Sequence, residues 1–161
     1  MPMFSLPAST PTLQFVIAAC LLAALVATAY ASGVSTLVAP FSATCALLAL
    51  LPKAPFSQPR TILLSHIICI GIGAVMVVLP IAFPVLVLVL LATWISIVLM
   101  ALFRVVHAPA VAHAAILGLG NQNVAEYTFW AMAVAALFTV YAYAAPLVAD
   151  RLVAKSVVSK V

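Results

Sequence analysis

The chain has 161 residues, of which 68% are apolar and only 5% carry a charged side chain. A soluble domain needs about a quarter of its residues charged to cover its surface, so this composition excludes a soluble globular fold and predicts an integral membrane protein. The formal net charge of +4 comes from few, scattered basic residues. Such a pattern sets orientation in a membrane and is not typical of nucleic-acid binding.

Six apolar runs follow one another along the chain. They cover residues 12–30, 35–51, 61–79, 81–106, 108–119 and 128–149. A helix needs about 20 residues to cross the hydrocarbon core, so five of the runs are predicted to span it. The run at 108–119 would rise only about 18 Å as a helix. It is therefore predicted to be broken, re-entrant or supported by its neighbours.

The polar breaks between the runs set the direction of each crossing. Six crossings place every loop or tail that carries a basic residue on one side; these residues are Lys53, Arg60, Arg104, Arg151, Lys155 and Lys160. The positive-inside rule makes that side cytoplasmic. We expect a protein of the bacterial inner membrane with its C-terminus in the cytoplasm. In the alternative with five crossings, residues 108–119 enter the bilayer without crossing it, and the basic tail would lie on the outer side.

The second half of the transmembrane region repeats the first at an offset of 69 residues, the separation of Pro40 and Pro109. Residues 39–50 align on 108–119 with six identities in twelve, and the runs at 12–30 and 61–79 map onto 81–99 and 130–148. Because each half has three segments, an odd number, the two halves cross the membrane in opposite senses. The sequence predicts an all-α membrane protein of about six transmembrane or half-membrane helices in a 3+3 inverted repeat.

The predicted domain organisation follows from this repeat. Residues 1–11 form an N-terminal stub, residues 12–149 the transmembrane domain with halves at 12–80 and 81–149, and residues 150–161 a basic cytoplasmic tail.

Segments two and five of the repeat open at prolines, which favour the first helical turn and disfavour helix before them. We therefore predict non-helical backbone at 35–39 and 104–108. A helix start buried in a bundle directs unpaired N–H groups and a positive dipole end at one point, which suits an anion. The candidate substrate-binding residues are Pro40, Ser42, Thr44, Arg104, His107, Pro109 and His113. In the alternative interpretation both prolines are plain kinks, filled by neighbouring helices.

Three histidines lie in or beside these apolar runs, where an imidazole is costly and indicates function by default. His113 stands roughly 240° around a helix from His107, so the two are not expected to act as paired metal ligands. His66 is expected to hydrogen-bond to a neighbouring helix. Arg104 can reach the headgroups or attract an anion. We expect no metal and no cofactor, and we assign Tyr30, Tyr127 and Trp130 to an interfacial aromatic belt.

Two stretches carry specific motifs. Residues 39–66 contain an A-P-F start, a Pro-rich loop ending in Q-P-R and then His66, and residues 107–116 read HAPAVAHAAI. Both stretches resemble the HPP family of small integral membrane proteins, whose name comes from an H-P-P-A-G-A-T-A-L stretch similar to residues 107–116. The resemblance covers residues 14–149 and implies an all-helical membrane domain and, as for some members in chloroplasts and cyanobacteria, nitrite transport. The chain departs from the pattern at Ala108, Val111 and His113, where the family has Pro, Gly and Thr.

The favoured function is a small-anion transporter or channel, with a nitrite-like monovalent anion implied by the resemblance. A protonatable His107 or His113 would then couple protons to anion uptake. The alternative is a non-transporting membrane subunit or assembly factor. We do not expect an enzyme, because the chain has no H-E-x-x-H, no intramembrane acid pair and no G-x-S-x-G. The expected partners are a small inorganic anion, the lipid bilayer and further copies of the chain, since six short segments can hardly enclose a path alone.

Overall fold

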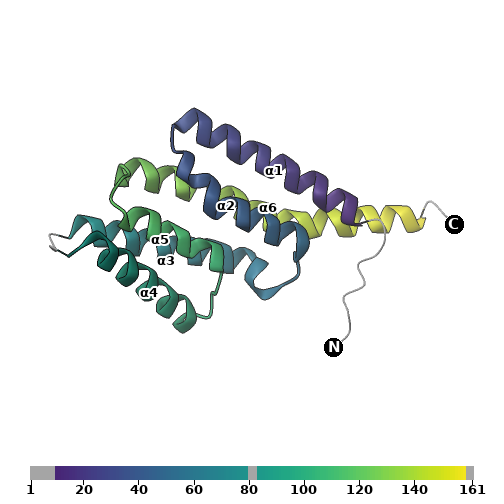
Figure 1. Cartoon of the computed structure of the whole chain (residues 1–161). Helices are drawn as coiled ribbons and strands as arrows, with labels where there is room; N and C mark the ends of the chain where they lie inside the picture. The colour runs from purple at the N-terminus through teal and green to yellow at the C-terminus, as the bar shows by residue number, and fades with distance from the viewer. Residues whose placement is uncertain (1–9, 80–82, 159–161) are drawn as a thin grey trace.

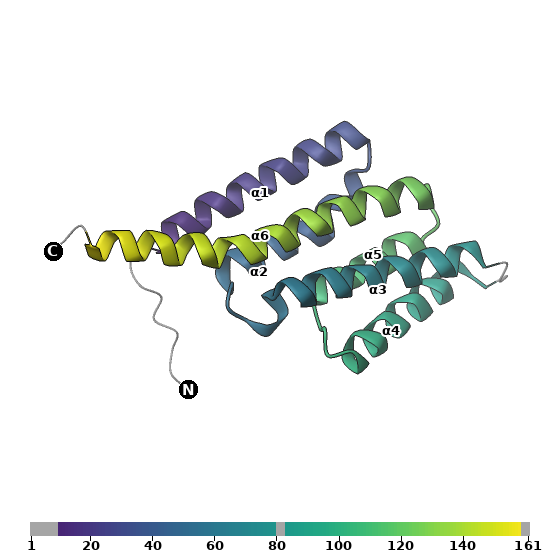
Figure 2. The same ribbon diagram turned by 180° about the vertical axis from the view of Figure 1, so that it is seen from behind.

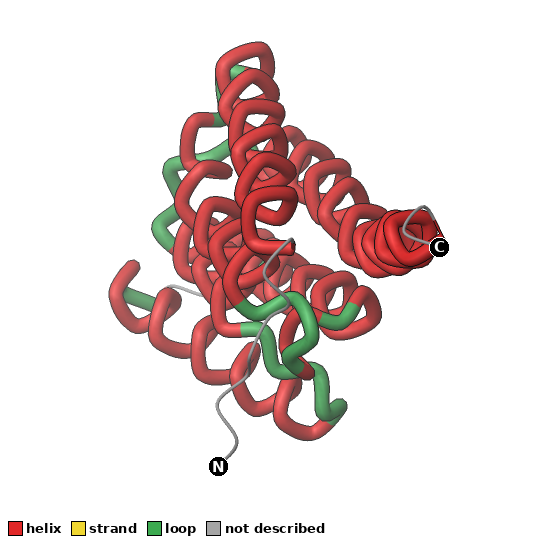
Figure 3. Tube along the Cα trace, turned by 90° about the vertical axis from the view of Figure 1, so that its right-hand side faces the viewer, coloured by secondary structure: helices red, strands yellow, loops and turns green. Residues whose placement is uncertain are grey.

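The computed structural model describes residues 10–79 and 83–158, and all the regular structure in this part of the chain is helical (Figure 3). The α-helices are α1 (Thr10–Ser32), α2 (Val38–Leu50), α3 (Pro59–Val78), α4 (Val85–Leu102), α5 (Val111–Gly118) and α6 (Val124–Val158). Single 3-10 turns precede α2, α3 and α5: η1 (Ser35–Leu37), η2 (Pro55–Ser57) and η3 (Ala108–Ala110). Within the described residues, three helical stretches are long and apolar enough to cross a membrane: Pro59–Val78, Val85–Leu102 and Val124–Ala145. The protein is thus an all-α membrane protein, as predicted.

Local signals in the sequence end and begin these helices. Gly33 has a φ of +73°, a conformation that glycine adopts without steric cost, and it follows the last residue of α1. Pro59 occupies the first position of α3, where its missing N–H is not needed. The side-chain oxygen of Asn123 accepts hydrogen bonds from the N–H groups of Ala125 and Glu126 and so caps α6. The breaks between the predicted runs, at 31–34, 52–60 and 120–127, contain these helix ends, although α3 begins at Pro59 and α6 at Val124, inside the predicted breaks.

The second segment of each half is short. Helix α2 has 13 residues and α5 has 8, which correspond to rises of about 20 Å and about 12 Å. The apolar helix at Ser35–Leu50 is therefore shorter than a full crossing, although the run at 35–51 was counted among those long enough to span; the short length predicted for 108–119 is confirmed. The two interrupted segments of the repeat have the same structure: each is a 3-10 turn that leads into a short α-helix.

The backbone before Pro40 is helical, contrary to the prediction for 35–39. Residues Ser35–Leu37 form η1, and α2 begins at Val38. Pro40 still falls in the first turn, so its missing N–H costs little. The side chains of Leu37 and Phe41 are fully buried, and this packing outweighs the local bias against helix before a proline. Before Pro109 the backbone of residues 105–107 is extended or irregular as predicted, and only Ala108 joins the turn η3.

Equivalent helices of the two halves run in opposite directions. In Figure 1, α1 runs from right to left and α4 from left to right; the pairs α2 and α5, and α3 and α6, are likewise opposed, and Figure 2 shows the same relation from behind. An inverted repeat requires this arrangement. Helix α6 continues to Val158, so the described part of the predicted tail at 150–161 extends this helix.

The described basic positions lie at one end of the bundle. That end carries the α2–α3 connection with Lys53, the start of α3 with Arg60, the α4–α5 connection with Arg104, and the C-terminal part of α6 with Arg151 and Lys155 (Figure 1). Lys160 lies outside the described residues. Glu126 is in the first turn of α6, at the opposite end. The predicted separation of basic and acidic loop residues is confirmed.

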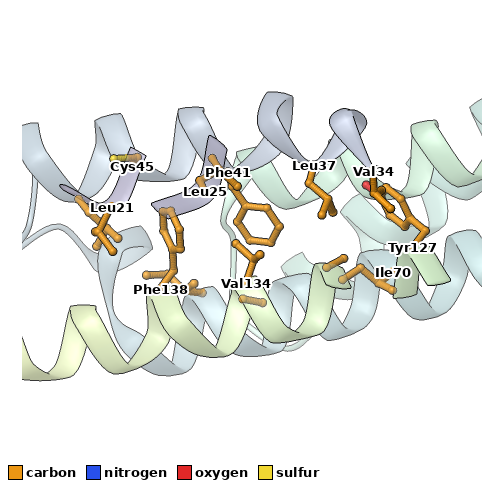
Figure 4. Close-up of a cluster of buried hydrophobic side chains, with 14 of the residues drawn as sticks. Leu21, Leu25, Val34, Leu37, Phe41, Cys45, Ile70, Tyr127, Val134 and Phe138 are labelled. Atoms are coloured by element: carbon orange, nitrogen blue, oxygen red, sulfur yellow. The ribbon is translucent and has the colours of Figure 1, made fainter. Parts of the chain in front are cut away.

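The main core lies between α1 and α2 on one side and α6 on the other. Buried Leu25, Phe41, Val134 and Phe138 belong to this cluster (Figure 4). By contrast α4 exposes large apolar side chains along its length, with Leu86 73% and Leu102 71% exposed. An apolar outer face of this kind is what the hydrocarbon of a bilayer covers.

Candidate functional site

Three imidazoles meet in the interior of the bundle. His66 comes from α3, His107 from the α4–α5 connection and His113 from α5, and all three are fully buried. The ring centroid of His66 lies 5.3 Å from that of His107 and 5.1 Å from that of His113. Phe41 of α2 stacks on His66 at 4.9 Å and meets the edge of His113 at 4.9 Å. We call His66, His107 and His113 the histidine cluster; its second and third members were predicted, but their meeting with His66 was not.

His107 is held by two partners. Its Nδ1 lies 2.8 Å from the carbonyl oxygen of Phe56, and its Nε2 lies 3.0 Å from Oγ1 of Thr44. A carbonyl only accepts, so Nδ1 carries a hydrogen and donates it. Burial lowers the pKa of His107, in the connection between α4 and α5, and the Phe56 carbonyl partly opposes this. A neutral His107 thus ties the start of segment five to α2 and to η2.

His66 and His113 each keep one ring nitrogen without a partner. The Nδ1 of His66 lies 2.8 Å from the carbonyl oxygen of Ile62, so the predicted hydrogen bond to a neighbouring helix was wrong. The Nδ1 of His113 lies 2.7 Å from the hydroxyl of Tyr127. Both Nε2 atoms are buried and have no hydrogen-bond partner among the described residues. A buried polar atom of this kind requires an explanation.

Three helical hydroxyl groups elsewhere in the bundle behave differently. Thr93, Ser96 and Thr139 each donate to the carbonyl four residues earlier in their own helix, at 2.7 Å. Each of these hydroxyl groups therefore has its hydrogen-bond partner within its own helix, as polar groups in a membrane helix can. Buried polar atoms without a partner also occur at Thr36, Ser57 and Thr128, so the distinguishing feature of the histidine cluster is that two such atoms lie on rings whose centroids are 5.1 Å apart.

Tyr127 is part of this site and not of an interfacial belt, so that prediction was wrong. Helix α6 begins at Val124, four residues before the predicted run, which places Tyr127 in its first turn. The side chain is fully buried, and its ring lies 5.7 Å from that of His113. Tyr30, in contrast, is 90% exposed, in agreement with the belt. A helix that starts earlier turns a predicted loop residue inward, which the polar break alone did not indicate.

The structure brings together three of the seven predicted site residues. Thr44, His107 and His113 share the cluster, and Pro40 is buried one turn before Thr44. Ser42 is half-buried and donates to the Ala39 carbonyl of its own helix. Pro109 is half-buried in η3, and Arg104 is exposed in the connection before it. Whether any of these residues binds an anion stays a prediction.

The helix starts themselves are less open than predicted. The 3-10 turns provide acceptors for early N–H groups: Leu37 donates to Val34 at 3.2 Å, and Ala110 donates to His107 at 3.1 Å. Fewer free N–H groups remain to bind an anion, so the side chains of the cluster offer the clearer polar groups. Among the described residues, no three His, Cys, Asp or Glu side chains converge so that they could hold a metal ion.

The fold and this buried cluster define a helical membrane protein with interrupted segments at equivalent places in two inverted halves. The family model named HPP, transmembrane region, matches residues 5–157. The chain therefore belongs to the HPP family, as its resemblance indicated. No curated protein and no solved structure gives a significant match.

Proposed function

We propose that this protein carries a small monovalent anion across the membrane, with nitrite as the first substrate to test. The observation that supports the proposal is the histidine cluster at the meeting of the two Pro-started segments. Ionisable side chains inside a membrane bundle are costly and generally belong to a transport path or relay. In transporters with inverted repeats, the site lies where interrupted segments of the two halves meet.

The chemistry of the cluster suits a small polar solute better than a hydrophobic one. It offers two open imidazole nitrogens, and the hydroxyl groups of Thr44 and Tyr127 hold two of its rings through hydrogen bonds to His107 and His113. The basic end of the bundle would raise the local concentration of anions, with Arg104 exposed on the connection that leads to His107. We propose a transporter or channel and no catalytic step, with further copies of the chain as its partners in the bilayer.

The test is anion flux into liposomes that contain the purified protein. We expect nitrite uptake above that of protein-free liposomes, and a strong decrease in a Thr44→Val, His107→Gln double variant. The control is Thr139→Val, which removes a self-satisfied hydroxyl outside the cluster. Loss of flux in the control as well would assign the effect to general destabilisation.

A negative result also has a definite meaning. If wild-type protein moves neither nitrite, nitrate, formate nor chloride, the transport proposal is overturned. The chain is then better described as a non-transporting membrane subunit, and co-purification of partner proteins becomes the next experiment.

A further inference from the structure

The partners of His66 and His113 determine where each ring carries its hydrogen. The Ile62 carbonyl accepts from Nδ1 of His66, so in the neutral ring Nε2 is a bare acceptor. The Tyr127 hydroxyl lies 2.7 Å from Nδ1 of His113 and has no other hydrogen-bond partner among the described residues. We therefore assign Tyr127 as the donor, since only this direction uses its hydrogen, and the hydrogen of His113 then lies on Nε2. The two open nitrogens are therefore one acceptor and one donor, on rings whose centroids are 5.1 Å apart.

No formal charge faces His66 in the described part of the chain. The rings of Phe41, His107 and His113 lie around the ring of His66. Thr44 and Tyr127 join the cluster through their hydrogen bonds to His107 and His113. The nearest charged residues along the chain, Arg60, Arg104 and Glu126, are exposed. An anion that reached the cluster alone would bring an uncompensated charge into a medium of low dielectric constant.

We propose that His66 and His113 form a proton-coupling pair, in which His66 takes up one proton for each anion that binds between them. The inference rests on the proposed function and adds its coupling ion and its substrate class. That class is the conjugate base of a weak oxyacid with two oxygens, such as nitrite or formate. One oxygen accepts from His66 and the other from His113.

The step balances without any further reactant. The Nε2 lone pair of His66 binds a proton from the medium or from the acid form of the substrate, and the ring becomes an imidazolium. The anion accepts hydrogen bonds from Nε2–H of His66 and Nε2–H of His113. On release the proton leaves Nε2 with the anion, while Nδ1–H stays on the Ile62 carbonyl. The cycle moves one negative and one positive charge together and is electrically neutral.

The experiment measures nitrite and proton movement in the same proteoliposomes, with pyranine inside as the pH indicator. Valinomycin and potassium set the membrane potential. Protein-free liposomes at each pH correct for nitrous acid that crosses the bilayer unaided. We expect acidification in step with nitrite uptake, at one proton per anion, and a flux that does not respond to membrane potential.

The possible results separate this inference from the proposed function. Nitrite flux that is driven by the potential and moves no protons overturns the coupling pair and leaves anion transport intact. Absence of any anion flux overturns both.

A variant of the proton acceptor gives a second test. His66→Gln keeps a polar side chain but cannot carry a proton, so we expect it to lose the acidification that accompanies nitrite uptake. The control is Ser65→Ala, the adjacent buried residue, whose hydroxyl donates to the same Ile62 carbonyl at 2.9 Å. Coupled uptake by His66→Gln would overturn the inference.

If His66→Gln does not fold, NMR of wild-type protein labelled with ¹⁵N-histidine replaces it. Addition of nitrite should convert one imidazole to imidazolium. Three rings that stay neutral in saturating nitrite would contradict the proposal.

Discussion

The contact between α3 and α5 and its repeat equivalent between α6 and α2 use matching positions but pack differently. A Cβ on Gly73 of α3 would lie 2.9 Å from Cβ of Leu117 and 3.1 Å from Cα of Ala114, both on α5. At the offset of 69 residues, the position of Gly73 is taken on α6 by Ala142. Helix α5 packs along α3, whereas α2 packs mainly on α1 and much less on α6. Absence of one methyl group thus allows the closer of the two contacts.

The close contact is also the one that holds the paired histidines. His113 on α5 and His66 on α3 correspond, at the same offset, to Thr44 on α2 and Ala135 on α6. The repeat produces two similar helix pairs, α3–α5 and α6–α2, and only the first brings two imidazoles together. Helix α2 of the second pair contributes Phe41 and Thr44 to the same cluster. A site between inverted halves need not be symmetric in its side chains.

The largest effect is expected from Gly73→Ala, which would make the α3 position like its α6 equivalent. The added methyl group meets backbone as well as side-chain atoms of α5, so the helices must separate. Overpacking of this kind costs about 1–3 kcal/mol. We expect this decrease in the free energy of unfolding, measured by denaturation in detergent micelles.

The matched control for Gly73→Ala is Gly71→Ala, two residues earlier on the same helix and on a different face of it. A Cβ there meets nothing within 4 Å. Alanine also has the higher helix propensity, by about 1 kcal/mol. Gly71→Ala should therefore leave the stability unchanged or raise it. Equal losses in both variants would contradict a specific α3–α5 contact.

A smaller effect is expected from Tyr127→Phe, which removes the partner of His113 while keeping the ring. Hydrogen bonds between membrane helices contribute about 0.6 kcal/mol on average and rarely more than about 1.7 kcal/mol. We expect a loss of about 1 kcal/mol in unfolding free energy, together with slower nitrite flux, because His113 is then free to move its hydrogen to Nδ1. Tyr143→Phe, at an exposed tyrosine on the same helix, is the control. Unchanged flux in Tyr127→Phe would show that the tautomer of His113 is unimportant.

Much of the fold could be predicted because the bilayer imposes simple rules on composition and length. The apolar runs, the break at Gly33 and the opposed directions of the halves follow from hydropathy and the repeat. The start of α2 could not be predicted, since the proline bias is local, whereas the burial of Leu37 and Phe41 depends on helices far away in the sequence.

The candidate site was predicted only in part, because local sequence selects single residues but not the contacts between distant ones. Thr44, His107 and His113 stand near the prolines, so position along the chain was enough to select them. A helical wheel placed His107 and His113 on different faces, which is correct for one helix. His107 lies in a connection, however, and His66 and Tyr127 join from α3 and α6. Contacts among four helices and a connection depend on packing, which the periodicity of one segment does not reveal.

The smallest effect is expected at Arg104, where the lead-ins to the two short helices differ. Arg104 has a φ of +56°, in the left-handed region, while its repeat equivalent Ser35 lies in the regular turn η1. Arg104→Gly relieves this backbone strain but also raises the entropy of the unfolded chain, so the net change in stability should stay within about 1 kcal/mol. Arg104→Lys keeps the charge and the strain and serves as the control.

If the exposed guanidinium draws anions toward His107, only the glycine variant should slow nitrite flux, and only at low ionic strength, because salt screens exposed charges. Equal flux in both variants at low salt would limit Arg104 to anchoring the connection at the headgroups.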